Sequence, residues 1–125
     1  MMDRPVDMLQ ECFDRQEKFM EMLREADRLP EWPVDMTSKP GQRMIRETMH
    51  NMNEELFEAG HTLKNRMHRL TDARLIDMDH YREELGDTFA YFMEICILSG
   101  FTAGELFEEF KRKNAIVRDR LENGY

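Results

Sequence analysis

Residues 45–70 decide the fold, and they carry the sequence IRETMHNMNEELFEAGHTLKNRMHRL. Apolar residues recur in this stretch in steps of three or four. They are Ile45, Met49, Met52, Leu56, Ala59, Leu63, Met67 and Leu70. This spacing places them on one face of an α-helix, which we expect to begin near Gln42 and to end near Leu70. Such a face must pack against other helices.

The same spacing predicts three further helices, over residues 6–29, 80–98 and 102–121. Asp79 is the expected N-cap of the second of these, and Thr102 with Glu105 has the capping-box pattern. Prolines and a glycine break the pattern over 30–41, and a short connection is expected over 71–78. No segment alternates with the period of two that a strand requires. The chain is therefore predicted to be all-α, a bundle of four to five helices forming a single domain over residues 1–125.

Composition and charge narrow the class of function. The 125 residues are 41% hydrophobic, and 26 acidic against 18 basic residues give a net charge of −8. This charge disfavours binding to a nucleic-acid polymer and suits a protein that gathers divalent cations. No apolar run is long enough to span a membrane, and the N-terminus lacks the pattern of a secretory signal. With only two cysteines as well, we expect no membrane partner and a cytoplasmic location.

The helix expected over residues 80–98 predicts an oligomer. Its second half, from Thr88 to Leu98, is apolar nearly all round. A helix of this kind must be covered on several sides, which four helices in so short a chain can barely do. We therefore expect a homodimer or a higher homo-oligomer whose interface includes this helix.

Acidic residues recur beside the apolar faces of two predicted helices. Glu55 and Glu58 flank the face of the 42–70 helix, and Glu84 and Asp87 share a flank of the next one. Antiparallel packing of the two helices would bring the four carboxylates together at the edge of the core. Their mutual repulsion would then be relieved by one or two divalent cations. Oxygen ligands alone favour Mg²⁺ or Mn²⁺.

The acidic residues allow two other interpretations. In a glutamate-rich chain, an acidic helix face is often only solvated. A di-iron bundle instead needs two Glu-x-x-His pairs on different helices. Glu47 with His50 and Glu58 with His61 have that spacing, but they lie on one predicted helix, about 16 Å apart along its axis. They cannot share one cluster, and the histidines are expected at the surface.

Positive charge is concentrated near the end of the chain. The basic and amide residues there are Lys111, Arg112, Lys113, Asn114, Arg118 and Arg120. Such residues can clamp phosphate oxygens. Alternatively, they complement the dipole of the last helix and pair with Glu108, Glu109 and Glu122.

The acidic motifs resemble those of a known family. Residues 54–58 read EELFE and residues 84–87 read ELGD. They match the EExxE–spacer–ExxD pattern of the all-α nucleoside triphosphate pyrophosphohydrolases, which comprise MazG-type enzymes and the dimeric dUTPases. The dimeric dUTPase branch is similar over residues 42–125. Further matches are the hydrophobic helix after the second motif, Ser99-Gly100, Glu105-Leu106-Phe107, Lys113-Asn114, Arg120 and Gly124-Tyr125.

The resemblance implies a reaction and a set of site residues. Mg²⁺ would be held on a nucleoside triphosphate by Glu55, Glu58, Glu84 and Asp87, and Glu58 would also orient the attacking water. The phosphates would be held by Lys113, Asn114 and Arg120, with Lys64 as a further contact. Attack of water on the α-phosphorus would give a nucleoside monophosphate and pyrophosphate. We expect dUTP as the first-choice substrate, in a phage-infected or bacterial cytoplasm.

Recognition of the base would involve the first predicted helix and the loop that follows it. Gln16 is the candidate for reading the base, with Gln10 as the alternative. Trp32 either stacks on a nucleobase as part of a lid or packs its loop on the helices. Val117 and the pair Met67-His68 stand where related sequences often carry Asn and Trp. Two functions therefore stay open beside a dUTPase: a MazG-type enzyme acting on other nucleotides such as purine deoxynucleotides, and a non-enzymatic helical interaction module.

Overall fold

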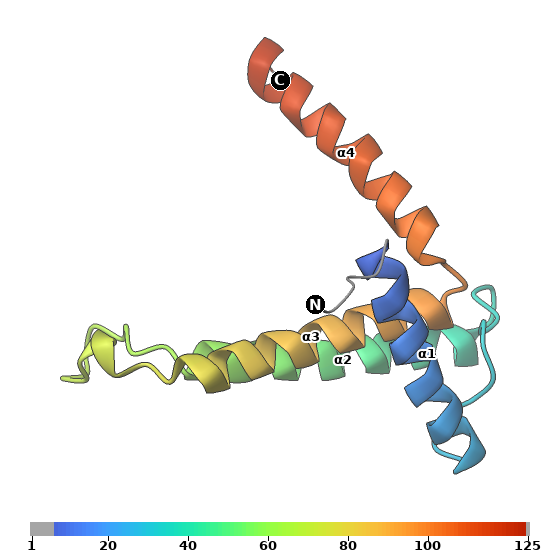
Figure 1. Ribbon diagram of the computed structural model, residues 1–125, viewed down its shortest axis with the longest axis horizontal. Coiled ribbons are helices and arrows are strands. Elements are labelled where there is room, and N and C mark those ends of the chain that lie inside the picture. The colour runs from blue at the N-terminus through green and yellow to red at the C-terminus, as the bar shows by residue number, and fades with distance from the viewer. Residues whose placement is uncertain (1–6, 125) are drawn as a thin grey trace, which may run out of the picture. The chain divides into compact units, whose positions relative to one another are not determined.

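The computed structural model describes residues 7–124 and contains four α-helices (Figure 1). They are α1 (Met8–Glu25), α2 (Lys39–His61), α3 (Met78–Leu98) and α4 (Ala103–Asn123), with the short 3₁₀ helix η1 (Ala73–Leu75) before α3. No strand occurs within residues 7–124, so the all-α prediction is confirmed. Val6 and Tyr125, which the sequence analysis placed in a helix and in the C-terminal motif, lie outside the described residues.

The helices are divided between two compact units. One, which we call the α2/α3 unit, comprises residues 34–95 and holds α2, η1 and most of α3. The other, the α1/α4 unit, comprises the described residues up to 33 and those from 96 onward. A single bundle and a dimer stay predictions. Within residues 7–124, no single helix is both long and apolar enough to cross a membrane, and only α3 and α4 taken together across their break reach that length and hydropathy.

The start of α2 is fixed by a cap and a glycine. Ser38 is the N-cap, and its Oγ accepts a hydrogen bond from the backbone N–H of Gly41 at 3.0 Å. Pro40 occupies the first turn, where its missing N–H costs nothing. A Cβ at position 41 would collide with the Asp35 carbonyl, so the close approach of the 34–38 segment requires glycine here.

The end of α2 differs from the prediction. The helix stops at His61 rather than near Leu70. The Thr62 hydroxyl donates to the carbonyl of Ala59 at 2.7 Å, and the backbone N–H of Thr62 bonds the same carbonyl, so the last turn tightens and closes. Met67 and Leu70, which continue the apolar spacing, are 99% and 107% exposed. The prediction was wrong because local capping ended the helix before its apolar face did.

Helix α3 begins at Met78, and its N-cap is Asp77 rather than Asp79. The Asp77 carboxylate accepts the backbone N–H of His80 at 3.1 Å, and its carbonyl accepts that of Tyr81 at 3.0 Å. Asp79 therefore lies inside the first turn. Helices α2 and α3 lie side by side and run antiparallel, joined by residues 62–77 (Figure 1). This arrangement positions the acidic motifs.

Hydrogen bonds at helix ends also shape the α1/α4 unit. Helix α1 ends at Glu25, earlier than the expected Leu29. Asp27 adopts a positive φ of 58°, and the Arg28 N–H reaches back to the Leu23 carbonyl at 2.8 Å, which closes the helix. At the start of α4, the capping box of Thr102 and Glu105 is present as predicted.

Candidate metal centre

The buried face of α2 carries a carboxylate. Ile45, Thr48 and Ala59 are buried on this face, and Met52 and Glu55 are half-buried between them. The steps of three and four that connect these residues place Glu55 on the side of α2 that packs into the unit. The apolar residues Met49 and Leu56, from the neighbouring row, are 42% and 46% exposed.

Helix α3 presents a second carboxylate in the same way. Glu84 begins a row that continues through Thr88, Tyr91, Ile95 and Leu98, and only 9% of the Glu84 surface is exposed. The Thr88 hydroxyl donates to the Glu84 carbonyl at 2.8 Å, as threonine commonly does within a helix. The α2 and α3 rows thus each carry one acid at the same level of the helix pair.

Three carboxylates meet at this level. Glu55, Glu58 and Glu84 each offer an oxygen atom, and these oxygens all lie within 4.8 Å of one another. The motif residues on two helices, separated by a long stretch of chain, are therefore brought together by the packing of α2 on α3. A set of ligands made only of carboxylate oxygens suits a hard divalent cation such as Mg²⁺ or Mn²⁺.

The Glu84 side chain is incompletely satisfied. Its Oε1 lies 3.1 Å from His80 Nε2, whereas its Oε2 is buried without a hydrogen-bond partner among residues 7–124. An unpaired buried carboxylate oxygen is costly, and native structures satisfy such atoms with a protein group, a water or an ion. This oxygen is independent support for a cation at the cluster, because crowding of acids alone does not require one.

The acids also perturb one another's protonation. The pKa of Glu55 is raised to about 7, chiefly by the close approach of the Glu84 carboxylate, and further by desolvation and by the charges of Glu58, Glu84 and Asp87. The pKa of Glu84 is lowered, chiefly by its interaction with Glu55 and further by Glu58 and His80, while desolvation acts in the opposite direction. Glu55 therefore takes up a proton near neutral pH in the folded protein, and a divalent cation could replace that proton.

Asp87 lies at the margin of the cluster. Its side chain is exposed, and it is not among the three carboxylates that come within 4.8 Å of one another. Its charge is nevertheless near enough to raise the pKa of Glu55. The structure thus brings together three of the four acids expected to bind metal and leaves the fourth close by.

A cavity of about 260 Å³ opens beside the cluster. Its walls are Glu58, His61, Thr62, Lys64, Leu75, Asp77 and His80. The expected phosphate contact Lys64 therefore shares a cavity with the expected water-orienting residue Glu58. All four histidines are exposed, as expected from the sequence, but the contact of His80 with Glu84 was not expected. The spacing of His80 and Glu84, one helical turn apart, was the available signal.

The other expected phosphate ligands lie in the α1/α4 unit. Lys113, Asn114 and Arg120 are exposed on α4. Two of their basic neighbours are engaged within the helix, because Lys111 pairs with Glu108 at 3.1 Å and Arg112 pairs with Glu109 at 2.6 Å. Among the basic residues of α4, Lys111 and Arg112 are therefore paired, whereas Lys113 and Arg120 form no salt bridge to another described residue.

Gln16, the expected base contact, belongs to the α1/α4 unit, as does Trp32, which was expected either to stack on a base or to pack its loop on the helices. This unit contains a cavity of about 270 Å³ with walls from α1, the Trp32 loop and the start of α4. Gln10, Phe13, Trp32 and Phe101 line it, whereas the half-buried Gln16 does not. The Trp32 indole N–H donates to Glu17 at 3.3 Å, and the Arg24 guanidinium lies 5.4 Å from the Trp32 ring centroid. Trp32 is therefore held against α1.

Comparison with known proteins adds no family assignment, because no family model, curated protein or solved structure matches this chain. Any function must therefore be argued from the motifs and from the geometry of the site.

Proposed function

We propose that this protein is a divalent-metal-dependent pyrophosphohydrolase of nucleoside triphosphates, with dUTP as the first-choice substrate. The observation that carries the proposal is the meeting of Glu55, Glu58 and Glu84 around a buried oxygen of Glu84 that has no partner among residues 7–124. The EExxE–ExxD resemblance supplies the reaction type, and the carboxylate cluster supports it independently.

The metal ligands in this proposal are Glu55, Glu58 and Glu84, with Asp87 at the margin. Mg²⁺ or Mn²⁺ held there would neutralise charge on the triphosphate. Glu58 is the exposed member of the cluster and also lines the neighbouring cavity, so it is placed to accept a hydrogen bond from a water. In this proposal the water attacks the α-phosphorus. The bond from the α-phosphorus to the oxygen that bridges it to the β-phosphorus breaks, so that pyrophosphate is the leaving group and the nucleoside monophosphate remains.

The contacts to the nucleotide are proposed with different degrees of structural support. Lys64 shares a cavity with Glu58, which supports its role at the phosphates. Lys113, Asn114 and Arg120 are proposed from the resemblance and from their exposure on α4. For the base, the aromatic cavity around Trp32 favours Gln10 over Gln16, because only Gln10 lines it.

A homodimer is part of the proposal. Leu56 and Phe57 on α2 are 46% and 66% exposed, and Phe89 and Phe92 on α3 are 40% and 37% exposed. Large apolar side chains gathered on two neighbouring helices usually mark an interface. A second copy of the chain would bury them and would explain why α3 is apolar on more than one side.

A panel of nucleotides tests the proposal directly. The purified chain is incubated with dUTP, dCTP, dTTP, dATP, dGTP and the ribonucleotides, with Mg²⁺ or with a chelator, and the products are separated by chromatography. Mg²⁺-dependent dUMP and pyrophosphate from dUTP alone support a dUTPase. Monophosphates from several bases favour the broader MazG-type activity. Absence of turnover for every nucleotide contradicts an enzyme and favours an interaction module whose acidic faces are solvated.

A further inference from the structure

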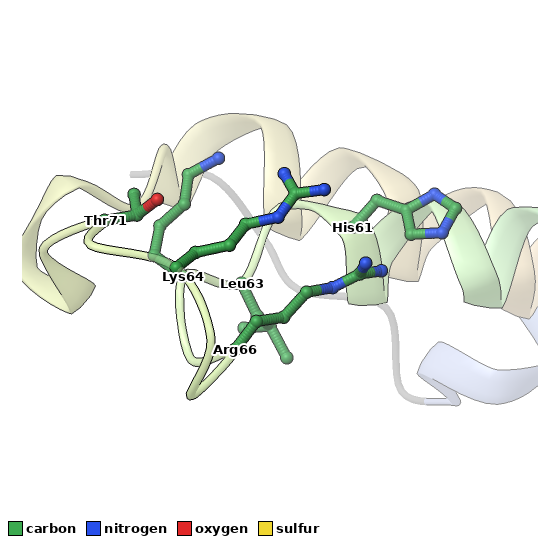
Figure 2. Close-up of a pocket in the computed structure, with 6 residues that line it drawn as sticks. His61, Leu63, Lys64, Arg66 and Thr71 are labelled. Carbon is green, nitrogen blue, oxygen red and sulfur yellow. The ribbon is translucent and has the colours of Figure 1, made fainter.

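The loop that follows α2 gathers positive charge in an otherwise acidic protein. Residues 61–71 contain Lys64, Arg66 and Arg69, two histidines and no acidic residue, whereas the whole chain has a net charge of −8. A cavity of about 260 Å³ lies in this loop. Its walls are His61, Leu63, Lys64, Arg66, Arg69 and Thr71 (Figure 2).

Backbone geometry brings the two arginines together. The backbone N–H of Arg69 donates to the Arg66 carbonyl at 3.1 Å, which closes a turn and places these residues at its two ends. Figure 2 shows the Arg66 guanidinium turned from the loop toward His61 at the end of α2. Early termination of α2 leaves residues 63–71 in a loop, and several of their side chains line this cavity.

These cationic groups are not neutralised by the protein. Within residues 7–124, the side chains of Lys64, Arg66 and Arg69 form no salt bridge and no hydrogen bond. Arg74, in the same connection, is different, because its guanidinium is held by Asp72 at 2.8 Å. Three like charges around one cavity repel one another, and an anion with several oxygens would relieve that repulsion.

The position of the cavity indicates which anion it would take. It shares His61 and Lys64 with the cavity beside the carboxylate cluster, and that second cavity also contains Glu58. A continuous set of walls therefore leads from the proposed metal ligands to the arginines. A linear phosphate chain bound to metal at one end would reach guanidinium groups at the other, and guanidinium forks match phosphate oxygens.

We propose that the 61–71 cavity binds the terminal phosphates of the nucleoside triphosphate and holds pyrophosphate after cleavage. This inference rests on the proposed function for the identity of its ligand. It assigns Arg66 and Arg69 as the principal contacts, with Lys64 between the two cavities and the Thr71 hydroxyl as a neutral donor.

Binding of pyrophosphate to the full chain tests the site. Calorimetry is performed in chelator, so that the carboxylate cluster contributes no metal-mediated affinity. The Arg66→Gln/Arg69→Gln variant is compared with Arg74→Gln, which removes a charge from the same connection outside the cavity. Loss of charge-assisted hydrogen bonds is expected to weaken binding by about 10- to 100-fold in the first variant and to leave the second near wild type. Equal affinities in all three proteins, or equal losses in both variants, overturn the proposal.

Two further measurements separate this site from the proposed function. In steady-state kinetics, Arg69→Gln should raise KM for the triphosphate, whereas pyrophosphate binding should persist in Glu84→Gln. Pyrophosphate binding that depends on the arginines in a protein that hydrolyses no nucleotide supports the site and contradicts the activity. Hydrolysis with an unchanged KM in Arg69→Gln overturns the site and leaves the activity standing. Displacement of pyrophosphate by an equimolar single-stranded oligonucleotide overturns the assignment to a small phosphate chain.

Discussion

The acidic cluster and the basic 61–71 cavity lie next to each other in the α2/α3 unit. They carry opposite charges, and they differ in how far those charges are removed from solvent. Glu55 and Glu84 are forced together by the packing of two helices, and the pKa of Glu55 is raised to about 7 as a result. Lys64, Arg66 and Arg69 line an open loop in which water solvates their charges. Charge crowding in the acidic cluster therefore opposes folding until it is neutralised, whereas charge crowding in the loop costs little and is available for binding.

This difference predicts different roles for a cation and an anion. A divalent cation at the cluster should change both activity and the stability of the fold, because it relieves repulsion between groups that cannot move apart. Substitution of a basic loop residue should weaken anion binding with little change in the stability of the unliganded protein, because exposed charges are already screened by solvent.

The largest effect is expected from Glu84→Gln. The substitution removes one negative charge from the centre of the cluster with little change in shape. We expect kcat/KM for the triphosphate to fall by more than about 100-fold, since loss of even outer-shell partners of a metal ligand costs about 10- to 100-fold. Glu83→Gln is the matched control, because Glu83 is exposed on the same helix and is not among the three clustered acids. Full activity of Glu84→Gln with unchanged circular dichroism would remove the metal-site assignment.

A second prediction concerns stability in the presence of metal. Mg²⁺ that binds only the folded protein stabilises it by about 2.7 kcal/mol at a concentration 100 times its Kd. For a chain of this size, that shifts Tm upward by about 10 °C. Differential scanning calorimetry of the wild type and of Glu84→Gln, with Mg²⁺ or chelator, measures the shift. An equal shift in both proteins would show that Mg²⁺ stabilises the fold elsewhere.

The same cluster makes stability depend on pH when no metal is bound. Because the pKa of Glu55 rises from 4.5 to about 7 on folding, the folded state holds its proton more tightly than the unfolded state. This contribution to stability is complete below pH 4.5 and is lost as pH rises to 7 and above. The lowered pKa of Glu84 has the opposite effect. Its contribution to stability is present above pH 4.5 and is lost as the pH falls below that value, through the lowered pKa of the folded state.

Glu55→Gln isolates this dependence. In chelator, its Tm should exceed that of the wild type at pH 8, and the difference should disappear toward pH 4.5. Glu94 has a pKa raised by burial and adds a trend of the same sign, so the comparison is made between the two proteins at each pH rather than along one curve. A difference in Tm between the two proteins that stays constant from pH 4.5 to pH 8 would show that protonation of Glu55 does not control stability.

The sequence predicted the acidic cluster better than the basic loop for a physical reason. Helical periodicity determines which face a residue occupies, so Glu55, Glu58 and Glu84 could be assigned to facing sides of two helices. Whether the three carboxylates come into contact, and whether Asp87 joins them, depends on the position of α2 along the axis of α3. Periodicity does not determine that position. The all-α fold and the Thr102 capping box followed from the same local rules.

The loop over residues 62–71 could not be predicted, because the apolar spacing of α2 continues through it. Leu63, Met67 and Leu70 continue the pattern of α2, and this regularity predicted a longer helix. The competing signal was Gly60 followed by Thr62, whose hydroxyl bonds the Ala59 carbonyl and ends the helix. With the helix end misplaced, positions 66 and 69 fell inside the expected helix over 42–70, and the cavity that Arg66 and Arg69 line was not predicted.

The smallest effect tests that helix end directly. Leu70 is fully exposed, so Leu70→Ser should change the free energy of unfolding by less than about 0.5 kcal/mol, as expected for surface substitutions. Burial of Leu70 on a helix that continued past His61 would instead make truncation cost about 2–5 kcal/mol. Ile45→Ala, on the buried part of α2, is the positive control and should show that larger loss. Urea denaturation of the three proteins, measured at several protein concentrations, distinguishes the two cases. A large loss of unfolding free energy in Leu70→Ser that depends on protein concentration would place Leu70 in an interface between copies of the chain. The loop around Leu70 would then not be exposed to solvent.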